Sequence, residues 1–468
     1  MQQLSGLDAS FLYLETPTAP MHVSGICIYD PSTAPGGEVR FKQIIEHYVA
    51  RAHLARCLRQ TVITVPFGLD HPWWLNDESF DPEFHIRHLA LPKPGDWRQL
   101  CIQVARLHAR PLDRAHPLWE SYVIEGLDGV VDLPPGSFAV FTKIHHAAID
   151  GQSGNEIIKA LHDLTPNTET TSPSESWQVD SKPSALGLLA RAQLNALREP
   201  FAFGKVLLNT MPDMAKGLLG LREGSMRGFP MAPRTRFNGT VSPHRVVEGV
   251  TISLDDVKAI KNNFDNVTVN DVALAVCGGA LHHYLTAHDE LPGKSMVAMA
   301  PISVRTEAQR QSAGNQVSSM LVALHTEISD ARERLLAVNA DTRRAKALSN
   351  AIGARTMTDY SQFVPSTITG LAARLASQVG LANRIRPVFN CIVTNVPGPQ
   401  VPLYQLGAKL IANYGFLPMF DSCGLGHVIN SYCGKVNIGV TSCREMMPDP
   451  AFYAACLLRS FEELQQAT

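Results

Sequence analysis

Apolar and polar residues follow two periods along the first 165 residues. Runs of aliphatic, β-branched and aromatic residues predict strands, and apolar residues three or four positions apart predict helices. Asp96 is a suitable N-cap for one helix, and Pro111 follows its end. Alternating strands and helices are typical of an α/β fold. The expected strands cover residues 21–29, 59–65, 84–91, 119–125 and 138–144, and the expected helices cover 41–54, 96–109 and 153–164.

A second block of the same kind begins near Arg245. Ser253 is a suitable N-cap for its first helix, and Asp255 and Asp256 follow in the first turn, where the helix dipole favours acids. The chain therefore predicts two α/β domains, residues 1–183 and 245–468. In the second domain, strands are expected over 245–252, 295–304, 316–325, 389–395, 409–417, 427–432 and 435–441, and helices over 254–263, 270–285, 330–348 and 450–464.

Residues 184–244 form a linker of different character. The preceding segment, 165–183, is rich in Ser, Thr, Pro and Glu, which predicts an exposed loop. Within 184–227, apolar residues at helical spacing are interspersed with more bases than acids. Such helices either lie on an anionic membrane or lipid droplet, or pack as a bridge across the two domains. The basic residues are Arg191, Arg198, Lys205, Lys216, Arg222 and Arg227.

Composition narrows the function classes. The chain has 468 residues, is 18% charged and carries a net charge of -2, so it has no overall basic field for nucleic acid. Its nine cysteines include no Cys-x-x-Cys pair, which indicates reduced thiols in a cytosolic protein. The first residues lack a signal-peptide pattern, and no apolar run reaches the length of about 18 residues that spans a membrane.

The candidate chemistry lies at residues 145–151, which read His-His-Ala-Ala-Ile-Asp-Gly. This turn joins the expected strand 138–144 to the helix 153–164, so its side chains are held on both sides. His146 is the candidate general base, because imidazole titrates near neutral pH. Asp150 lies four residues on, and Gly151 lets a ligand approach the backbone. A pair of merely solvated histidines is the plain alternative, and a zinc site lacks further ligands at metal spacing.

Two later positions have a structural and a functional interpretation. Asn270 and Asp271 open an expected helix, where either side chain can cap backbone N–H groups, or the amide can orient a carbonyl or support an oxyanion. Arg305 ends an expected strand and can pair with a carboxylate such as Asp150 or meet a phosphate. Gly278 and Gly279 interrupt the same helix and indicate close helix packing.

Read together, these motifs resemble known families. The pattern His-His-x-x-x-Asp-Gly resembles the active-site motif of acyltransferases of the chloramphenicol acetyltransferase type. Over nearly the whole chain, an ordered set of stretches resembles the bacterial wax ester synthase/diacylglycerol acyltransferases. That set is Leu-Asp-Ala-Ser-Phe-Leu at 7–12, Pro-Met-His-Val at 20–23, Pro-Leu-Trp-Glu at 117–120, Asn-Asp-Val-Ala-Leu-Ala at 270–275, Pro-Ile-Ser-Val-Arg at 301–305, Gly-Asn-Gln at 314–316, Thr-Asn-Val-Pro-Gly-Pro at 394–399 and Asn-Ser-Tyr-x-Gly at 430–434.

The resemblance implies two chloramphenicol-acetyltransferase-like domains with an active-site tunnel between them. It implies transfer of a long-chain acyl group from acyl-CoA to a fatty alcohol, giving wax ester, or to diacylglycerol, giving triacylglycerol. His146 would be the general base, His145 a support and Asp150 a holder of the loop. Asn270 and Asp271 would lie near the active site, and Asp271 and Arg305 are the candidate substrate-binding residues. No metal or bound cofactor is expected, and the protein would work in the cytoplasm, attached peripherally to the inner membrane or lipid inclusions.

Two other functions are compatible with parts of this pattern. A condensation or polyketide-associated acyltransferase shares the histidine motif but takes its acyl group from a carrier protein; the opening Leu-Asp-Ala-Ser-Phe argues against it. A non-catalytic lipid-droplet protein would use only the helices of 184–228, and the intact His146 and Asp150 argue against that.

Overall fold

The structure of the protein is a computed structural model. It describes residues 1–77, 80–149, 153–167, 180–195, 197, 230–303, 317–352 and 381–467. The expected site residues Asp150, Gly151 and Arg305, and positions 198–228 of the linker, lie outside these ranges.

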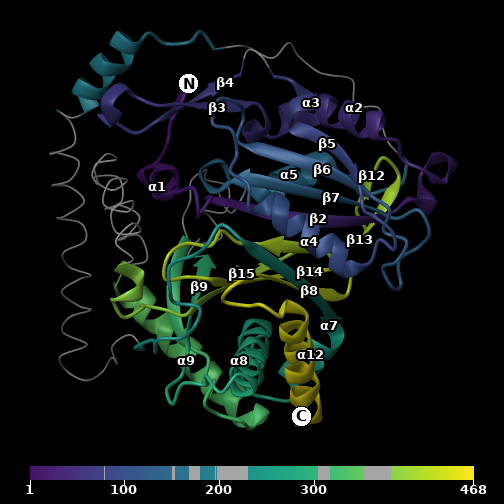
Figure 1. The fold of residues 1–468 in the computed structure, drawn as a ribbon, viewed down its shortest axis with the longest axis vertical. Coiled ribbons are helices and arrows are strands. Elements are labelled where there is room, and N and C mark those ends of the chain that lie inside the picture. The colour runs from purple at the N-terminus through teal and green to yellow at the C-terminus, as the bar shows by residue number, and fades with distance from the viewer. Residues whose placement is uncertain are drawn as a thin grey trace.

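One six-stranded sheet belongs mainly to the N-terminal half. Its strand order is β12-β13-β2-β7-β6-β5, and its central strands β2 and β7 are antiparallel. Apolar side chains cover both of its faces, and helices lie on both sides of the sheet (Figure 1). The strands are β2 (His22–Asp30), β5 (Ile86–Ala90), β6 (Trp119–Glu125), β7 (Phe138–His145), β12 (Tyr404–Gln405) and β13 (Ala408–Phe416).

The helices of this half lie on opposite sides of the sheet. On one side, α2 (Phe41–Arg51) and α5 (Ser153–Leu161) join one apolar cluster with Trp119, and His85 of α3 (Pro82–His85) stacks on the Trp119 ring. On the other side, α4 (Trp97–His108) lies between the two large sheets (Figure 1). The side chain of Asp96 accepts a hydrogen bond from the Gln99 N–H, which confirms the predicted N-cap of α4.

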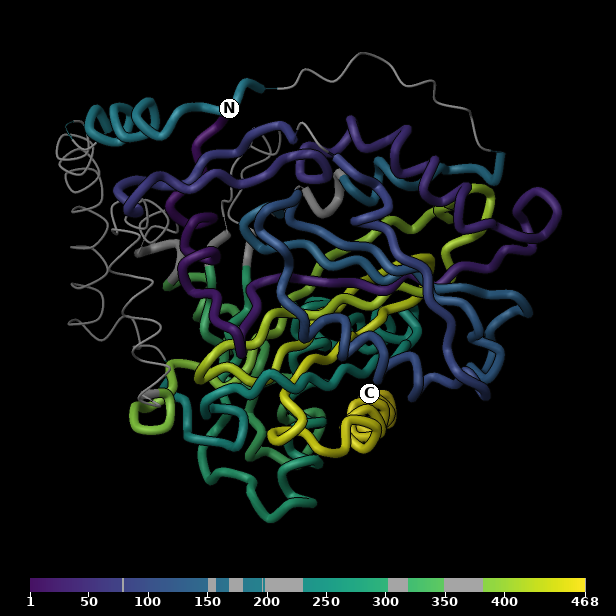
Figure 2. Tube along the Cα trace, turned by 45° about the horizontal axis from the view of Figure 1, so that its top comes forward, coloured from purple at the N-terminus to yellow at the C-terminus, as the bar shows by residue number. Residues whose placement is uncertain are grey.

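A three-stranded sheet and a short helix form the edge of the N-terminal half. The sheet has the order β1 (Gln2–Gln3), β4 (Trp73–Asn76), β3 (Gln60–Ile63), and α1 (Gly6–Leu14) follows β1. A helix over 185–195 packs on this sheet through Leu188 and Ala192. Figure 2 shows that helix beside the N-terminus. None of the described helices is long and apolar enough to cross a membrane.

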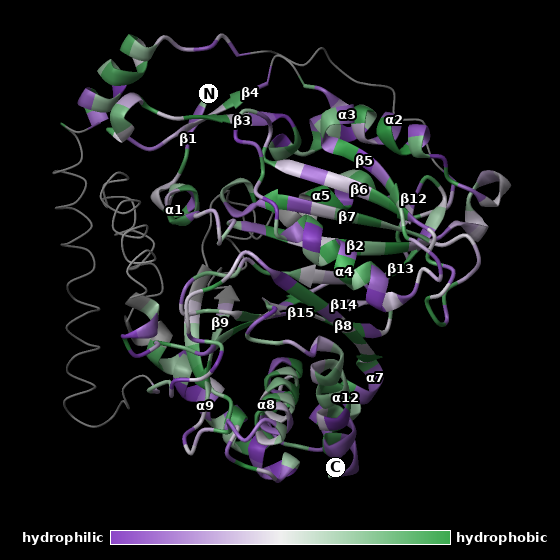
Figure 3. Ribbon diagram, in the orientation of Figure 1, coloured by the Kyte–Doolittle hydropathy of each residue, from purple (hydrophilic) through white to green (hydrophobic). Residues whose placement is uncertain are grey.

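The second six-stranded sheet has helices on its outer face. Its order is β10-β9-β11-β14-β15-β8, with β11 parallel to both of its neighbours. Helix α8 is coloured mainly as hydrophobic in Figure 3, in keeping with its many buried residues. The elements are β8 (Arg245–Ser253), α7 (Leu254–Asn262), α8 (Val269–Ala287), β9 (Val297–Ser303), β10 (Val317–Ala323), α9 (Ala331–Ile352), β11 (Cys391–Pro397), β14 (Leu425–Tyr432), β15 (Lys435–Cys443) and α12 (Pro450–Gln466).

The two halves are interleaved rather than consecutive. Strands β12 and β13 come late in the chain, yet β13 pairs with β2 from Lys409↔Asp30 to Phe416↔Ser24. The predicted boundary at residue 245 therefore separates two stretches of the chain, but each stretch does not form a sheet of its own, because β12 and β13 belong to the N-terminal sheet. A crossover of this kind ties the N-terminal sheet to the C-terminal half through backbone hydrogen bonds.

The predicted α/β fold is confirmed, with differences in detail. The sequence did not predict α1 or β4, and the expected strand 84–91 begins with the helical turn of α3, so that β5 starts only at Ile86. The close packing predicted for the glycines of α8 is confirmed. A Cβ at Gly278 would lie 2.4 Å from the Leu324 carbonyl oxygen, and one at Gly279 would lie 2.2 Å from Ser460 Oγ.

Candidate active site

The two adjacent histidines lie where β7 ends. His145 is the last residue of the strand and pairs with His22 of β2, while His146 opens a single 3-10 turn, His146–Ala148. The backbone N–H of His146 donates to the Met21 carbonyl at 2.8 Å. The stretch Pro-Met-His-Val at 20–23 thus holds the backbone of this turn from the neighbouring strand.

His145 has both ring nitrogens engaged. Its Nδ1 accepts the Ala147 N–H at 3.1 Å, so this nitrogen carries no proton. Its Nε2 lies 2.7 Å from Glu15 Oε2 and therefore donates its N–H to that carboxylate. Burial is the main cause that lowers the pKa of His145, and Glu15 opposes it only in part. His145 is thus a neutral, fixed tautomer that cannot accept a further proton without breaking the turn.

His146 is held differently. Its ring stacks on Phe11 of α1, with centroids 3.9 Å apart and planes 13° apart. Its Nδ1 is buried and has no hydrogen-bond partner among the described residues. Burial lowers the pKa of His146 to about 4; the backbone of His146 opposes this shift, and the nearby His145 adds to it. The ring is therefore neutral at neutral pH, which is the form that accepts a proton.

The sequence did not single out Glu15 or Arg114. Glu15 follows α1 directly, and its carboxylate contacts His145 and, at 3.3 Å, Arg114 Nη2. Arg114 also donates to the Leu12 carbonyl at 2.9 Å. A signal for α1 was present, because Ser5 accepts from the Asp8 N–H as an N-cap. Nothing in the local pattern showed that the residue after this helix meets the histidine turn.

A buried charge pair lies two residues before the histidines. The ammonium group of Lys143, completely buried, lies 3.0 Å from Glu120 Oε2 and donates to the Arg110 carbonyl at 2.9 Å. Tyr122 donates to the same glutamate at 2.6 Å. The motif Pro-Leu-Trp-Glu at 117–120 thus supplies the partner of a buried lysine, and breaking such a pair leaves an uncompensated charge.

The first turn of α8 differs from the sequence-based expectation. Its N-cap is Thr268, whose side chain accepts from the Asp271 N–H, so Asn270 is not the cap. The buried carboxylate of Asp271 accepts from the N–H and hydroxyl of Thr268, and from Asn339 and Thr342 of α9. Four donors fill the capacity of a carboxylate. Asp271 therefore joins α8 to α9, and the substrate-binding role expected for it would need an oxygen that these donors do not use.

The side chain of Asn270 is partly buried in that same first turn. Since Thr268 and Asp271 make the cap, the amide of Asn270 is not required for it. A role of this amide in the reaction stays a prediction.

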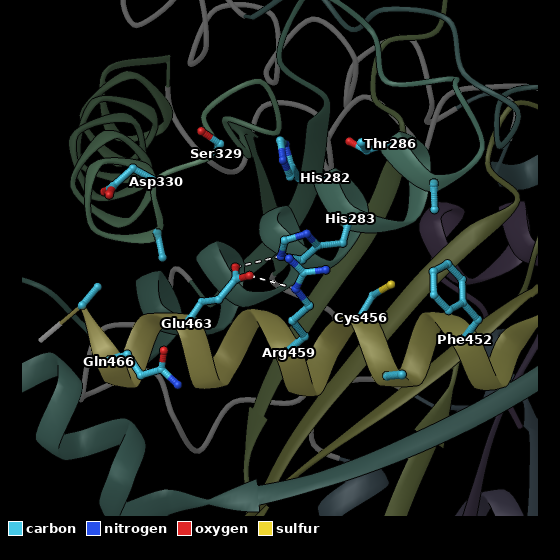
Figure 4. A pocket seen from close by; sticks show the side chains of 14 residues that line it. His282, His283, Thr286, Ser329, Asp330, Phe452, Cys456, Arg459, Glu463 and Gln466 are labelled. Atoms are coloured by element: carbon cyan, nitrogen blue, oxygen red, sulfur yellow. Dashed lines mark hydrogen bonds and ion pairs between the residues drawn. The ribbon is translucent and has the colours of Figure 1, made fainter.

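A cavity of about 740 Å³ lies among the outer helices of the C-terminal half (Figure 4), on the far side of the second sheet from β7 (Figure 1). It is bounded by α8, α12 and the start of α9. Within it, Glu463 accepts from His283 Nε2 at 2.8 Å and from Arg459 Nε at 2.9 Å. The described residues contain no group of histidines, cysteines and carboxylates arranged to hold a metal ion.

The two mixed sheets with their crossover strands match the chloramphenicol-acetyltransferase-like fold. More closely, the chain belongs to the wax ester synthase/diacylglycerol acyltransferase family. Residues 4–273 match the wax ester synthase/diacylglycerol acyltransferase catalytic domain, and residues 313–465 match the WS/DGAT C-terminal domain. The protein is therefore an acyltransferase, as the sequence motifs indicated.

Individual relatives support this placement. A putative diacylglycerol O-acyltransferase of Mycobacterium tuberculosis is 34% identical over 96% of this chain and 87% of its own length. The O-acyltransferase WSD of Acinetobacter baylyi is 32% identical, over 96% of this chain and 93% of its own length.

Solved structures agree with the relatives. The wax ester synthase/diacylglycerol acyltransferase from Marinobacter aquaeolei covers 100% of this chain and 99% of its own, with a TM-score of 0.71 and 26% identity. A starter condensation domain of rhizomide synthetase has a TM-score of 0.56 over 99% of this chain and 94% of its own, at 14% identity. The latter likeness concerns the fold alone.

Proposed function

We propose that the protein transfers a long-chain acyl group from acyl-CoA to a fatty alcohol, forming wax ester, and to diacylglycerol as a second acceptor. The observation that carries this proposal is the neutral, partly buried imidazole of His146 at the end of β7. The names of the relatives point to the same acceptor classes.

The proposed reaction needs a general base and the alignment of the two bound substrates, because the thioester is already an activated acyl donor. A ring nitrogen of His146 takes the proton of the acceptor hydroxyl while the oxygen attacks the thioester carbonyl. The carbon–sulfur bond then breaks, and the proton passes from His146 to the leaving CoA thiolate. A positioned base of this kind contributes about 10²–10⁴-fold. His145 cannot replace it, because its acceptor nitrogen already receives the Ala147 N–H.

Other parts of the proposal come from the sequence pattern and from the resemblance to the family. Asn270 would orient the thioester carbonyl or support the oxyanion, Asp150 would hold the loop, and Arg305 would meet a carboxylate or a phosphate. The tunnel between the two halves would hold both acyl chains. Attachment to a membrane or lipid inclusion would be peripheral.

Incubation with palmitoyl-CoA and either hexadecanol or a diacylglycerol tests the acceptor classes, with thiol release and lipid product as readouts. We expect turnover with both. Transfer only from an acyl carrier protein would favour the condensation-domain alternative, and absence of turnover with every donor would favour the lipid-droplet protein.

His146→Ala tests the base itself. The variant should lose ester formation by about 10²–10⁴-fold with an unchanged melting curve. His145→Ala should cost less activity but more stability, because the His145 side chain holds the turn through two hydrogen bonds, one with the Ala147 N–H and one with Glu15. If the His146 variant kept most of its turnover, the assignment of the base would be wrong.

A further inference from the structure

Glu15 is placed to control the histidine turn although it belongs to no element of that turn. Its side chain is 11% exposed, and its Oε2 lies 2.7 Å from His145 Nε2 and 3.3 Å from Arg114 Nη2. Burial alone would raise the pKa of Glu15, but the hydrogen bond and charge of His145 and the guanidinium of Arg114 bring it below its usual value. The carboxylate is therefore charged at neutral pH and can only accept hydrogen bonds.

An acceptor at this place selects one tautomer of His145. With the proton on Nε2, the ring donates to Glu15 and Nδ1 remains free to accept the Ala147 N–H. With the proton on Nδ1, two N–H groups would face each other at 3.1 Å, and the 3-10 turn would lose its cap. Because the ring is buried, an unsatisfied donor there strongly disfavours this second tautomer.

The same helix also holds the second ring. Phe11 of α1 stacks on His146 at 3.9 Å, and Glu15 follows the last residue of that helix. Arg114 links the end of α1 to Glu15 through the Leu12 carbonyl. The turn of His146 is therefore held at its backbone by Met21, at its cap by His145, and on its ring face by Phe11.

We propose that Glu15 is a positioning residue: its carboxylate fixes the Nε2–H tautomer of His145, and the capped turn then holds His146 in its reactive place. This proposal rests on the proposed function, in which His146 takes the proton. Glu15 does not meet the substrate in it, so its effect is on the rate of the chemical step and not on binding of acyl-CoA.

The C-terminal half offers a matched control. Glu463 binds His283 at 2.8 Å and Arg459 at 2.9 Å, the same trio of groups as Glu15, His145 and Arg114, in the outer cavity of Figure 4. Glu463→Ala removes an equivalent cluster far from the histidine turn. Any loss of kcat that is only a consequence of losing a Glu–His–Arg cluster should appear there as well.

The kinetic test compares Glu15→Ala, Glu15→Gln and Glu463→Ala in the whole protein. Glu15→Ala should lower kcat by about 10- to 100-fold, because small misplacements of a reacting group have effects of this size, and should change the KM for palmitoyl-CoA by less than about two-fold. Glu15→Gln keeps an acceptor oxygen for Nε2–H and should retain kcat within about three-fold. Glu463→Ala should leave kcat unchanged. A full kcat for Glu15→Ala, or an equal loss for Glu15→Gln, would overturn the proposal.

A second measurement does not depend on turnover. Nitrogen NMR of histidine-labelled protein distinguishes protonated from unprotonated ring nitrogens, and His145→Gln identifies the signal. The wild type and Glu15→Gln should show a proton on Nε2 of His145, and Glu15→Ala should show a mixture of tautomers. A proton on Nδ1 in the wild type, or an unaltered signal in Glu15→Ala, would overturn the proposal even if the acyl-transfer reaction proved different.

Discussion

His145 and His146 are neighbours in the chain with different chemical roles. Both ring nitrogens of His145 are hydrogen-bonded within the protein, one to the Ala147 N–H and one to Glu15. His146 keeps a buried nitrogen that no described residue contacts by a hydrogen bond. The first is thus part of the scaffold, and the second keeps the free nitrogen that the proposed reaction requires, although both are imidazoles.

The low pKa of His146 predicts the pH dependence of the reaction. A base whose pKa is lowered to about 4 stays unprotonated at pH values where a free histidine is half charged. Initial values of kcat/KM should therefore stay level from pH 8 to about pH 5.5 and fall only below it. Assays in which the protein is exposed to each pH only briefly separate this acid-side fall in kcat/KM from a loss of activity through acid unfolding. A limb centred near pH 6.5 would show that His146 is not held in this environment in the free enzyme.

The sequence singled out the two histidines of the turn but not the residues that support them. A strand end followed by a helix signal is local information, and it placed His145 and His146 correctly. Glu15 and Arg114 reach the turn only after the chain has folded, 130 and 31 positions away, so local periodicity has no access to them. Glu120 is a similar case. The sequence motif at 117–120 contains this residue, but its partner Lys143 becomes apparent only from the pairing of β6 with β7.

At the scale of elements, the first turn of α8 contains a helix cap, made by Thr268 and Asp271, and the amide of Asn270, which takes no part in that cap. Thr268 and Asp271 satisfy each other's backbone N–H groups, and Asn270 lies between them in the chain. The sequence predicted this helix but began it at Asn270, since Thr268, Asn270 and Asp271 can each be an N-cap. Only the backbone angles of Thr268, which are extended, decide where the helix starts.

This division predicts opposite effects of two neighbouring substitutions. Thr268→Ala should lower the free energy of unfolding by about 1 kcal/mol through loss of the cap, with kcat little changed. Asn270→Ala should leave stability within about 0.5 kcal/mol and lower kcat more than it raises KM, if the amide acts on the transition state. Urea unfolding and steady-state kinetics on both variants provide the measurement. A fully active Asn270→Ala would remove Asn270 from the reaction.

At the scale of the whole molecule, buried neutral histidines link stability to pH. Burial lowers the pKa of His108 to about 3 and that of His427 to about 4, as it does for His146. In the unfolded chain these groups titrate near pH 6.5. Between about pH 6.5 and about 4, the unfolded chain therefore binds protons that the folded protein does not, and stability falls as pH falls. His325, whose pKa is raised by Asp341, acts in the opposite direction.

The urea midpoint should accordingly decrease from pH 7 to pH 5. His427→Gln should show a smaller decrease than the wild type, because one proton-linked group is removed while a donor to Tyr453 or the Ile392 carbonyl can be kept. A midpoint that is constant or rises over this interval would contradict the assignment of these histidines as buried and neutral.

The fold class could be predicted from the sequence, but the pairing of strands that are distant in the chain could not. The alternation of strands and helices was sufficient for the α/β class and for most element bounds. The pairing of β13 with β2 could not be predicted, because strand partners far apart in sequence leave no periodic signal. The sequence therefore suggested a domain boundary before residue 245, whereas strands from both sides of that boundary form the N-terminal sheet.

One exposed apolar surface bears on how such a protein reaches lipid substrates. The helix over 185–195 buries Leu188 and Ala192 against the small sheet, while Leu186 is 80% and Leu194 56% exposed. Phe67, 82% exposed, lies in the connection between β3 and β4, the strands on which this helix packs. Arg191 of the helix stacks over Trp73 of that sheet. Exposed leucines beside a basic residue are typical of a surface that enters the headgroup region.

We therefore expect reversible binding to anionic liposomes that weakens as salt rises, since the basic residues of 184–227 would contribute attraction that ions screen. The double substitution Leu186→Glu and Leu194→Glu should reduce flotation with liposomes at least as much as Glu in place of Arg198, Lys205, Lys216 and Arg222. Val131→Glu is the matched control, because Val131 is 81% exposed in the connection between β6 and β7. Transfer to short, water-soluble alcohols should survive in all variants, because the histidine turn is unchanged. If the double variant floated like the Val131 control, the helix would be better described as a bridge within the protein than as its attachment to lipid.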